Sequence, residues 1–498
     1  MTSLKRDRSS VPSKRLAGRR AAVRALGLVS VSALCLTAAP KSAHAVGSEN
    51  FEWHWYSRLG MAWSPYGQSA QGASTNLLGF GIGGRHEEGD YSEPSFVAHV
   101  VKGATPQDLY VKSEMTFAIW PTHGSFMQPS SNGGDTIEVE FNQAYIESGN
   151  FLVPGLSVWG GARFFREQYA PIGDYFYLDD LSGQGGGIKY ENLNLAIIGR
   201  TCCRTGTSAP GYVFPAEPAT PELGEGGIRR DRTIFAGNYK FEFGGEAKHH
   251  VKVHAEAHVL QAAQQGPDME ERAPGDFGGV IGAKLHLGLG QGNWSDTSVR
   301  FGTGIANGAA GGAKTYETWG APNSDGTYAG SMALEAVEHV GFRIGDIAAL
   351  EGLATFHYTK AAYEAEGAAP PTNLESQLDF SVQANAMIFA HKNFHPVVEA
   401  SFQGRKDGEN EMGTAVKVSV VPTLVPTGEL SAGARPHFKL IYTAAFYNDA
   451  AVLQNMTPYN NGGGYIARMG LRRTNADGTF GVRSNVGHYI GARTDWYF

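Results

Sequence analysis

Apolar and polar side chains alternate along residues 51–63, which read FEWHWYSRLGMAW. Successive side chains of a β-strand point to opposite faces, so this segment predicts a strand with two unlike sides. One side holds Trp53, Trp55, Leu59, Met61 and Trp63, and the other holds Glu52, His54, Tyr56 and Arg58. A soluble sandwich would bury the apolar side in its core, whereas a membrane barrel would turn it toward lipid.

The same alternation recurs in HHVKVHAEAHVL at 249–260, YKFEF at 239–243 and ENLNLAI at 191–197. Polar pieces rich in turn residues separate these runs, among them QQGPDMEERAPGD at 264–276 and YNNGGG at 459–464. Short alternating strands joined by polar loops are typical of an outer-membrane barrel.

The end of the chain, HYIGARTDWYF, favours the same class. Counting back from Phe498, one face carries Trp496, Thr494, Ala492 and Ile490. A strand that ends on aromatic residues suits anchoring at the membrane interface. At roughly 10 residues per strand, the chain after Val46 can supply more than a dozen strands. We therefore predict an all-β barrel whose tryptophans face lipid and whose polar set faces the lumen.

The first 45 residues predict a secretory signal peptide that is removed from the mature protein. Nine Lys or Arg residues accompany the apolar stretch ALGLVSVSALCLTAA, which ends near SAHA. Small residues at Ala43 and Ala45 form a cleavage pattern, so we expect cleavage just before Val46 and a barrel domain over 46–498. The apolar stretch is too short for a good membrane helix.

Charge and cysteine content exclude further classes. Removing the nine basic residues and Asp7 leaves 32 Lys plus Arg against 47 Asp plus Glu, a net charge of −15. So acidic a domain is not expected to bind nucleic acid. The adjacent Cys202 and Cys203 have neither the number for a disulfide framework nor metal-site spacing. We expect them in a loop, either bonded to each other or free.

Several of these segments, taken together, resemble the segments of one known family. FEWHWYSRLGMAW, then VPGLSVWGGARFF at 153–165, DYFYLDD at 174–180, SGQGGG at 182–187 and the final GARTDWYF resemble the maltoporin family, which includes sucrose porins. The central block is similar to that family's third strand pair and its inward-folded third loop. Between residues 200 and 480 the assignment depends on periodicity and length alone.

The resemblance implies an 18-stranded antiparallel transmembrane β-barrel, assembled as a homotrimer in the outer membrane of a Gram-negative bacterium. It implies facilitated diffusion of maltose and maltodextrins through a water-filled channel, without a cofactor. Such a mechanism is physically reasonable, because aromatic rings offer contact surface to the C–H faces of sugars. Charged side chains exchange hydrogen bonds with the hydroxyls, and each contact must be weak enough to release the sugar.

The resemblance also places residues of the barrel wall along this channel. They are Tyr56 and Tyr497 on the aromatic slide, Arg58 on the polar track, and Tyr91 and Glu93 in the second-strand segment GDYSE. Pro94 can shift the register of that segment, in which case Phe96 takes the place of Tyr91.

In the third loop, Asp174 matches an aspartate of the family. The constricting tyrosine of the family falls on Phe176 or, with a shift of one residue, on Tyr177. The loop arginine falls on Glu167, with Arg166 one step away.

Other positions depart from the family pattern. The second wall arginine falls on Asn142, no tryptophan is visible in the second-loop segment PTHGSFMQPSSNGGD, and the first-loop cysteine pair is missing. These departures reduce the positive charge at the constriction and leave open a different oligosaccharide or glycoside, or a general diffusion pore.

Other functions fit the sequence less well. An anion-selective porin needs a ladder of Arg and Lys in the lumen, which a net charge of −15 opposes. A soluble lectin or glycosidase would also use aromatic residues and carboxylates for sugars, but it has no need of lipid-facing tryptophans. His250, His254 and His258 are expected to line the lumen, and we expect no metal site. No serine stands out as part of a catalytic triad, so we do not expect an enzyme.

Overall fold

The computed structural model describes residues 50–79, 82–122, 124–126, 137–201, 231–245, 248–264, 272–308, 314–320, 322–323, 325–362, 375–457 and 464–498. The expected signal peptide at 1–45 lies outside the described residues, as do Cys202 and Cys203. Among the described residues, no helix has the length and apolar character needed to cross a membrane.

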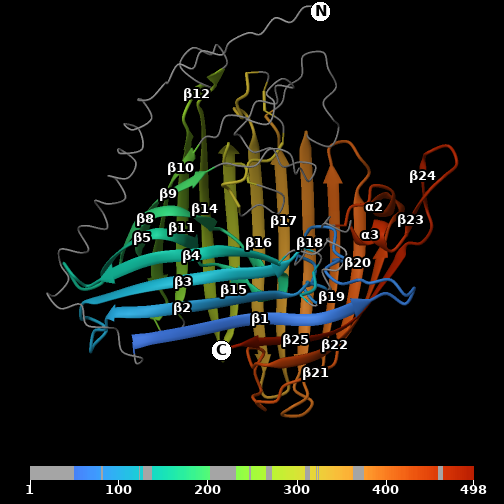
Figure 1. Ribbon diagram of the computed structural model, residues 1–498, viewed down its shortest axis with the longest axis horizontal. Coiled ribbons are helices and arrows are strands. Elements are labelled where there is room, and N and C mark those ends of the chain that lie inside the picture. Colours follow the sequence, from blue (N-terminus) through green and yellow to red (C-terminus); the bar gives the residue numbers. More distant parts are fainter. Residues whose placement is uncertain are drawn as a thin grey trace, which may run out of the picture. The chain divides into compact units, whose positions relative to one another are not determined.

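The described residues from Asn50 onward form a closed antiparallel barrel of 18 strands (Figure 1). The strands are β1 (Phe51–Trp63), β2 (Tyr91–Val101), β3 (Tyr110–Pro121), β4 (Ile137–Gly149), β5 (Leu156–Arg166), β8 (Asp180–Tyr190), β9 (Leu193–Thr201), β10 (Asp231–Phe243), β11 (His249–Leu260), β14 (Asp276–Gly290), β15 (Asn293–Gly304), β16 (Met332–Ile344), β17 (Ala348–Lys360), β18 (Ser376–Ile388), β19 (Val397–Asp407), β20 (Gly413–Val421), β22 (His437–Tyr447) and β25 (Val486–Tyr497).

The first and last strands close the barrel. β1 pairs with β2 on one edge and with β25 on the other, where Tyr56 lies opposite Tyr497 and Trp63 lies opposite Ile490. Lipid cannot form hydrogen bonds with the backbone groups of an open sheet edge, and a closed barrel has no such edge. The short β21 (Thr423–Leu424) extends the wall beside β22.

The alternation seen in the sequence sorts side chains to the two faces of this wall. Large apolar side chains such as Phe241, Ile281 and Leu440 are exposed on the outer face. On the inner face lie buried polar side chains, among them Lys252, His254, Glu256 and His258 of β11. An apolar exterior around a polar interior is the reverse of a soluble protein, and it is the arrangement predicted for a membrane barrel.

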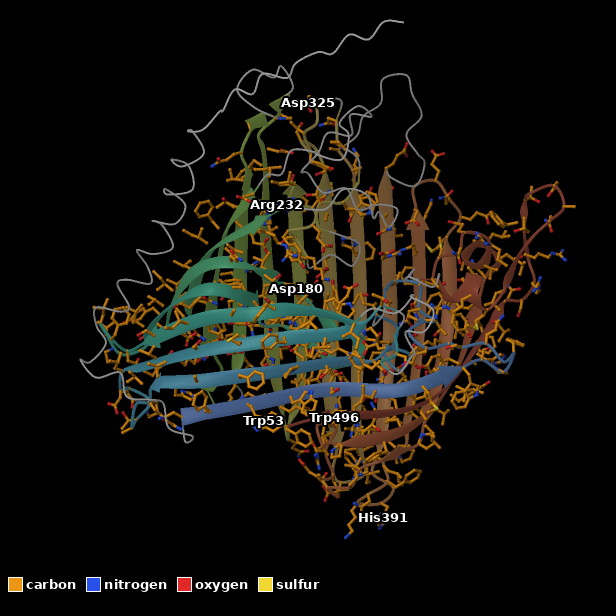
Figure 2. The ribbon with its side chains drawn as sticks, in the orientation of Figure 1. Trp53, Asp180, Arg232, Asp325, His391 and Trp496 are labelled. Atoms are coloured by element: carbon orange, nitrogen blue, oxygen red, sulfur yellow. The ribbon has the colours of Figure 1, made fainter. Side chains whose placement is uncertain are left out.

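The tryptophans of the opening segment lie on the outer face. The Trp55 ring centroid lies 6.0 Å from that of Trp53 and 5.8 Å from that of Trp496. Trp53 is 56% exposed, and Figure 2 labels Trp53 and Trp496 along this part of the wall. Tyr56, of the opposite parity, points inward to loop residues described below. The predicted sidedness of this strand is confirmed.

The two ends of the barrel differ in the length of their connections. Short turns join β8 to β9 at 191–192, β14 to β15 at 291–292 and β16 to β17 at 345–347, whereas 64–90, 305–331 and 448–485 are long loops at the other end. Figure 2 labels His391, in a short connection, and Asp325, in a long loop, at opposite ends of the barrel. Outer-membrane barrels place short turns in the periplasm and long loops outside the cell.

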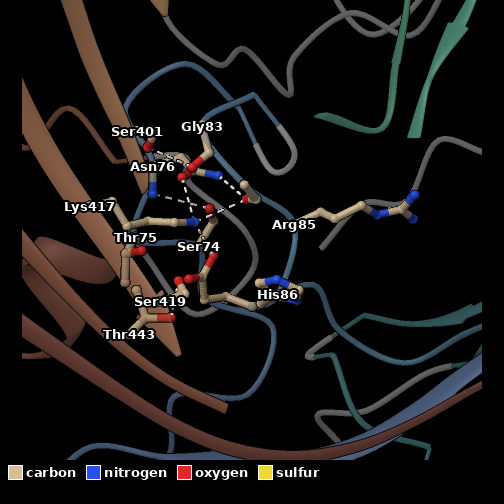
Figure 3. Close-up of polar contacts among 12 residues, drawn as sticks. Ser74, Thr75, Asn76, Gly83, Arg85, His86, Ser401, Lys417, Ser419 and Thr443 are labelled. Carbon is tan, nitrogen blue, oxygen red and sulfur yellow. Dashed lines mark hydrogen bonds and ion pairs between the residues drawn. The ribbon is translucent and has the colours of Figure 1, made fainter. Parts of the chain in front are cut away.

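The first loop, 64–90, folds into the barrel and packs on its inner wall. Figure 3 shows Lys417 of β20 beside Asn76, to whose Oδ1 its ammonium donates at 3.0 Å. The same ammonium donates to the Gly84 carbonyl at 3.1 Å. It also pairs with Glu87 at 2.8 Å. Gly84 has φ +117°, and a Cβ there would lie 2.0 Å from Glu399 Oε1. Only glycine permits this close approach.

The third loop, 167–179, folds inward as predicted, and it contacts β15 and β16. It contains the short strands β6 (Tyr169–Ala170) and β7 (Tyr175–Phe176) around the 3₁₀ turn η3 (Pro171–Gly173). The Tyr175 hydroxyl donates to Glu335 of β16 at 2.5 Å, and the Tyr177 hydroxyl donates to Asp296 of β15 at 3.0 Å. The apolar core lies between these inward loops and the wall; it includes Leu77, Leu78, Ile172, Leu178, Val337 and Leu353.

Two further long loops close over the inner wall. The sixth loop, 305–331, is held by Arg232 of β10, which donates to Thr318 Oγ1 at 2.6 Å. The last long loop carries α2 (Asp449–Leu453), α3 (Tyr465–Arg468), β23 (Arg472–Thr474) and β24 (Phe480–Val482). The remaining short strands are β12 (Ala263–Gln264) and β13 (Arg272–Ala273) in the fifth loop.

Candidate channel constriction

The first strand contributes an aromatic ring and a guanidinium to the lumen. Tyr56 and Arg58 share the inward parity of β1, and the Arg58 guanidinium lies 3.1 Å from Glu88 Oε2 of the first loop. Arg58 also donates to the Gly89 carbonyl at 2.8 Å and lies over the Tyr91 ring at 4.9 Å. The Tyr56 and Tyr91 rings are 6.1 Å apart. The predicted residues Tyr56, Arg58 and Tyr91 are therefore adjacent.

Arg85 of the first loop joins the first strand to the third loop. Its guanidinium donates to the Tyr56 hydroxyl at 3.2 Å and to the Tyr169 hydroxyl at 2.7 Å. It pairs with Glu88 at 3.0 Å and lies 3.7 Å from Asp174. Figure 3 shows Arg85 pointing away from the Lys417 contact. One side of the first loop therefore contacts the barrel wall, and the other side extends into the channel.

Neighbouring charges hold Arg85 and Asp174 in their charged forms. Burial disfavours a charged guanidinium, but Asp174 and Glu88 outweigh it and raise the pKa of Arg85 above its ordinary value. Burial would raise the pKa of Asp174, but Arg85 and Arg58 outweigh it and hold that pKa well below its ordinary value. The ion pair between Arg85 and Asp174 is therefore charged at neutral pH.

A tight turn of the third loop presents Asp174. Pro171 begins η3, and Asp174 ends it in the left-handed region at φ 44°. The Tyr169 hydroxyl donates to Asp174 Oδ1 at 2.8 Å, and the Tyr169 ring lies 4.7 Å from the Phe176 ring. Tyr169 and Phe176 are opposite each other in the β6–β7 pair, so the hairpin presents two rings side by side.

The row of rings continues into β5 through Arg166. Its guanidinium lies 3.9 Å from the centre of the Phe176 ring and 3.6 Å from that of the Phe164 ring. It also pairs with Asp180 at 3.6 Å. A guanidinium between two aromatic faces is a favourable cation–π arrangement, which fixes all three side chains.

These contacts form one continuous feature, which we call the constriction path. It consists of the rings of Tyr91, Tyr56, Tyr169, Phe176 and Phe164 and the guanidiniums of Arg58, Arg85 and Arg166. Apolar ring faces alternate along it with fixed hydrogen-bond donors.

Two predicted residues of the third loop anchor the loop. Tyr177 is 1% exposed and bonds to Asp296, whereas the Phe176 ring packs against Tyr169 and Arg166. Glu167 pairs with Lys252 of β11 at 2.8 Å. Burial would raise the pKa of Glu167, but Lys252 outweighs it and lowers that pKa.

The remaining predicted residues lie beside the path. Asn142 donates to Glu93 at 3.0 Å and to the Tyr91 hydroxyl at 3.3 Å. Tyr497 is 58% exposed, and its ring stacks on His54 with centroids 6.4 Å apart. It is the cross-strand neighbour of Tyr56.

The sequence did not single out Arg85 or Tyr169. Both lie in loops, where side chains follow no period and only the tertiary contacts bring them to the channel. Across the described part of the chain, no cluster of three or more His, Cys, Asp or Glu residues is arranged to hold a metal ion. His254 and His258 instead lie on either side of Glu256, each with Nε2 2.7 Å from a carboxylate oxygen.

Comparison with solved structures finds porins of low sequence identity. OpdK of Pseudomonas aeruginosa with vanillate is 9% identical with a TM-score of 0.42, covering 90% of this chain and 99% of that one. The anion-selective porin from Comamonas acidovorans is 9% identical with a TM-score of 0.40, covering 90% and 99%. OmpT of Vibrio cholerae, in its trimer form, is 8% identical with a TM-score of 0.38, covering 90% and 99%.

A comparison with models of protein families matches nearly the whole barrel sequence. The family model described as "LamB porin" matches residues 51–494, which run from the first residue of β1 into β25. The match therefore spans the whole barrel, including 200–480, where periodicity alone supported the assignment. This chain is an outer-membrane porin and belongs to the LamB porin family.

Proposed function

We propose that this porin lets maltose and maltodextrins diffuse across the outer membrane, with another oligosaccharide or glycoside, or general diffusion, as the alternative. The observation that carries the proposal is the constriction path, where five rings and three guanidiniums follow one another. A sugar has apolar C–H faces and a rim of hydroxyls, and the path offers a partner to each.

The mechanism is a series of weak, replaceable contacts. Ring faces of Tyr56 and Tyr91 and then of Tyr169 and Phe176 pack against the sugar. The guanidiniums of Arg58 and Arg85 and the Asp174 carboxylate replace hydrogen bonds to water that the sugar loses. Because the side chains are already paired with one another, the sugar gains no contact tight enough to trap it.

The test is current block in planar lipid bilayers. Maltohexaose added to open pores should reduce the current in a concentration-dependent way, and Tyr56→Ala should weaken that block. We expect a loss of about 1–3 kcal/mol at most, the range of aromatic stacking on other ring-shaped ligands. Tyr497→Ala, which removes an exposed ring that stacks on His54, should have a smaller effect.

The outcome separates the candidate functions. Pores that stay open at millimolar maltohexaose contradict the maltodextrin assignment and leave another solute or general diffusion. Equal block in the wild type and in Tyr56→Ala contradicts the role of the path.

The rest of the proposal concerns assembly and export. We propose that residues 1–45 are removed on secretion and that the barrel forms a homotrimer in outer-membrane lipid. Conductance that rises in groups of three equal steps, one for each pore, would support the trimer. An N-terminus at Val46 in the mature protein would support the cleavage site.

A further inference from the structure

A hollow lies inside the barrel on the short-turn side of the third loop. Its volume is about 470 Å³. It extends from Arg166 and Glu167, at the base of the third loop, to Pro106 and Gly155 in two short turns. We call it the exit chamber, because a solute that passes the constriction from outside the cell reaches it next.

The exit chamber carries an excess of positive charge. Four cations, Lys112, Arg163, Arg166 and Lys189, line it together with two carboxylates, Glu147 and Glu167. Glu167 is already paired with Lys252 at 2.8 Å, and Arg166 with Asp180 at 3.6 Å. The lining therefore leaves three cations against the single carboxylate of Glu147, in a protein whose mature chain is strongly acidic.

Arg163 holds a fixed position in this lining. It pairs with Glu147 at 2.6 Å and lies over the Tyr145 ring at 4.5 Å and the Trp159 ring at 5.4 Å. The glycine run of β8 lets Trp159 lie flat against the wall, since a Cβ at Gly187 would be 2.4 Å from the indole Nε1. One cation thus neutralises Glu147 on a rigid aromatic support.

The other two cations are available to a ligand. Lys189 is exposed, and in the described residues no carboxylate lies within 4.0 Å of its ammonium. Lys112 lies 3.8 Å from Glu147, whose closer partner is Arg163. The half-buried rings of Tyr110 and Phe164 also line the chamber, so apolar contact surface lies beside the free charge.

We propose that the exit chamber binds the anionic group of an acidic sugar, with Lys112 and Lys189 as the cations that take up its carboxylate. The proposal rests on the proposed sugar transport and extends it to a class of substrate. Tyr110 and Phe164 pack against the sugar ring, and the two ammonium groups neutralise the charge that a neutral maltodextrin lacks.

The test compares maltose with maltobionate, in which the reducing-end glucose is oxidised to an open-chain carboxylate and the other glucose ring is kept. Both are titrated as blockers of the wild-type pore in planar bilayers in about 0.1 M salt, where charge interactions within ~10 Å are only partly screened. Block constants are extrapolated to zero voltage. We expect maltobionate to bind several-fold more tightly than maltose, and the preference to fall about fivefold in Lys112→Gln/Lys189→Gln.

Two controls isolate the chamber. Lys392→Gln removes one exposed lysine from a short connection at the same end of the barrel, outside the chamber, and should keep the preference. The double variant leaves Glu147 paired with Arg163, so no buried charge is orphaned, and its maltose block should match the wild type.

Several results would overturn the proposal. The first is equal block of the wild-type pore by maltose and maltobionate. The second is an unchanged preference for maltobionate in the double variant. The third is block by sodium sulfate alone that is as strong as block by maltobionate. Block by maltose together with no preference for maltobionate would refute the chamber while leaving the proposed sugar transport intact. If neither maltose nor maltobionate blocked the current, the chamber proposal and the proposed sugar transport would both be refuted.

Discussion

At the scale of single residues, Arg85 has the most connections in the constriction path. Its guanidinium contacts two hydroxyls and two carboxylates, from β1, the first loop and the third loop. It therefore positions the Tyr56 and Tyr169 hydroxyls, and under the proposed function it also offers donors to a sugar. Lysine cannot reproduce this, because an ammonium lacks the planar fork of five donors.

Arg85→Gln should weaken maltohexaose block about tenfold. The variant loses charge-assisted hydrogen bonds, each worth about 1.5–3 kcal/mol, and it releases the Tyr56 and Tyr169 hydroxyls. The block constant from noise or single-channel analysis measures the effect. Arg473→Gln, an exposed arginine of β23 at the same end of the barrel, is the control. An unchanged block constant in Arg85→Gln would exclude Arg85 from the path.

The residue scale also shows what sequence can and cannot predict. The inward face of Tyr56 and Arg58 could be predicted because strand parity fixes the face on which a side chain lies, whereas Tyr91 was placed by the family resemblance. Tyr177 and Phe176 could not be separated, since a loop has no parity, and only the bond from Tyr177 to Asp296 distinguishes them. Arg85 and Tyr169 gave no signal, because their roles depend on two loops meeting inside the barrel.

At the scale of elements, the first and third loops fold into the barrel and contact its inner wall. The first loop is attached to the wall through Lys417, which is 1% exposed at its side chain and has acceptors on Asn76, Gly84 and Glu87. The strands themselves were predictable from alternation. The inward fold of the first loop was not, since it depends on the complementarity of Lys417 with a loop hundreds of residues earlier in the chain.

Lys417→Met should detach the first loop from the wall. The substitution leaves the Glu87 carboxylate buried without its partner, a defect that costs about 3–5 kcal/mol, and the loop can avoid this cost by moving into water. We expect a larger single-channel conductance and weaker maltohexaose block, since Arg85 moves with the loop. Lys392→Met, at an exposed site, should change neither. Wild-type conductance in a folded Lys417→Met barrel would contradict the proposed attachment.

At the scale of the whole molecule, sidedness connects the fold with its function. Trp53, Trp55 and Trp496 lie on the outer face, where aromatic rings suit the membrane interface, and the opposite parity carries the path into the lumen. This sidedness could be predicted from thirteen residues of β1, whereas the chemistry inside the barrel required the loops. One closed wall separates lipid from the polar interior of the porin, and the proposed sugar transport takes place along that interior.

The most direct test of the central claim is a crystal structure of the protein with maltohexaose, at a concentration that blocks the current. We expect glucose rings in contact with Tyr56, Tyr91, Tyr169 and Phe176, with hydroxyls bonded to Arg58, Arg85 or Asp174. Sugar bound only away from these residues, or a constriction that holds water alone under those conditions, would contradict it.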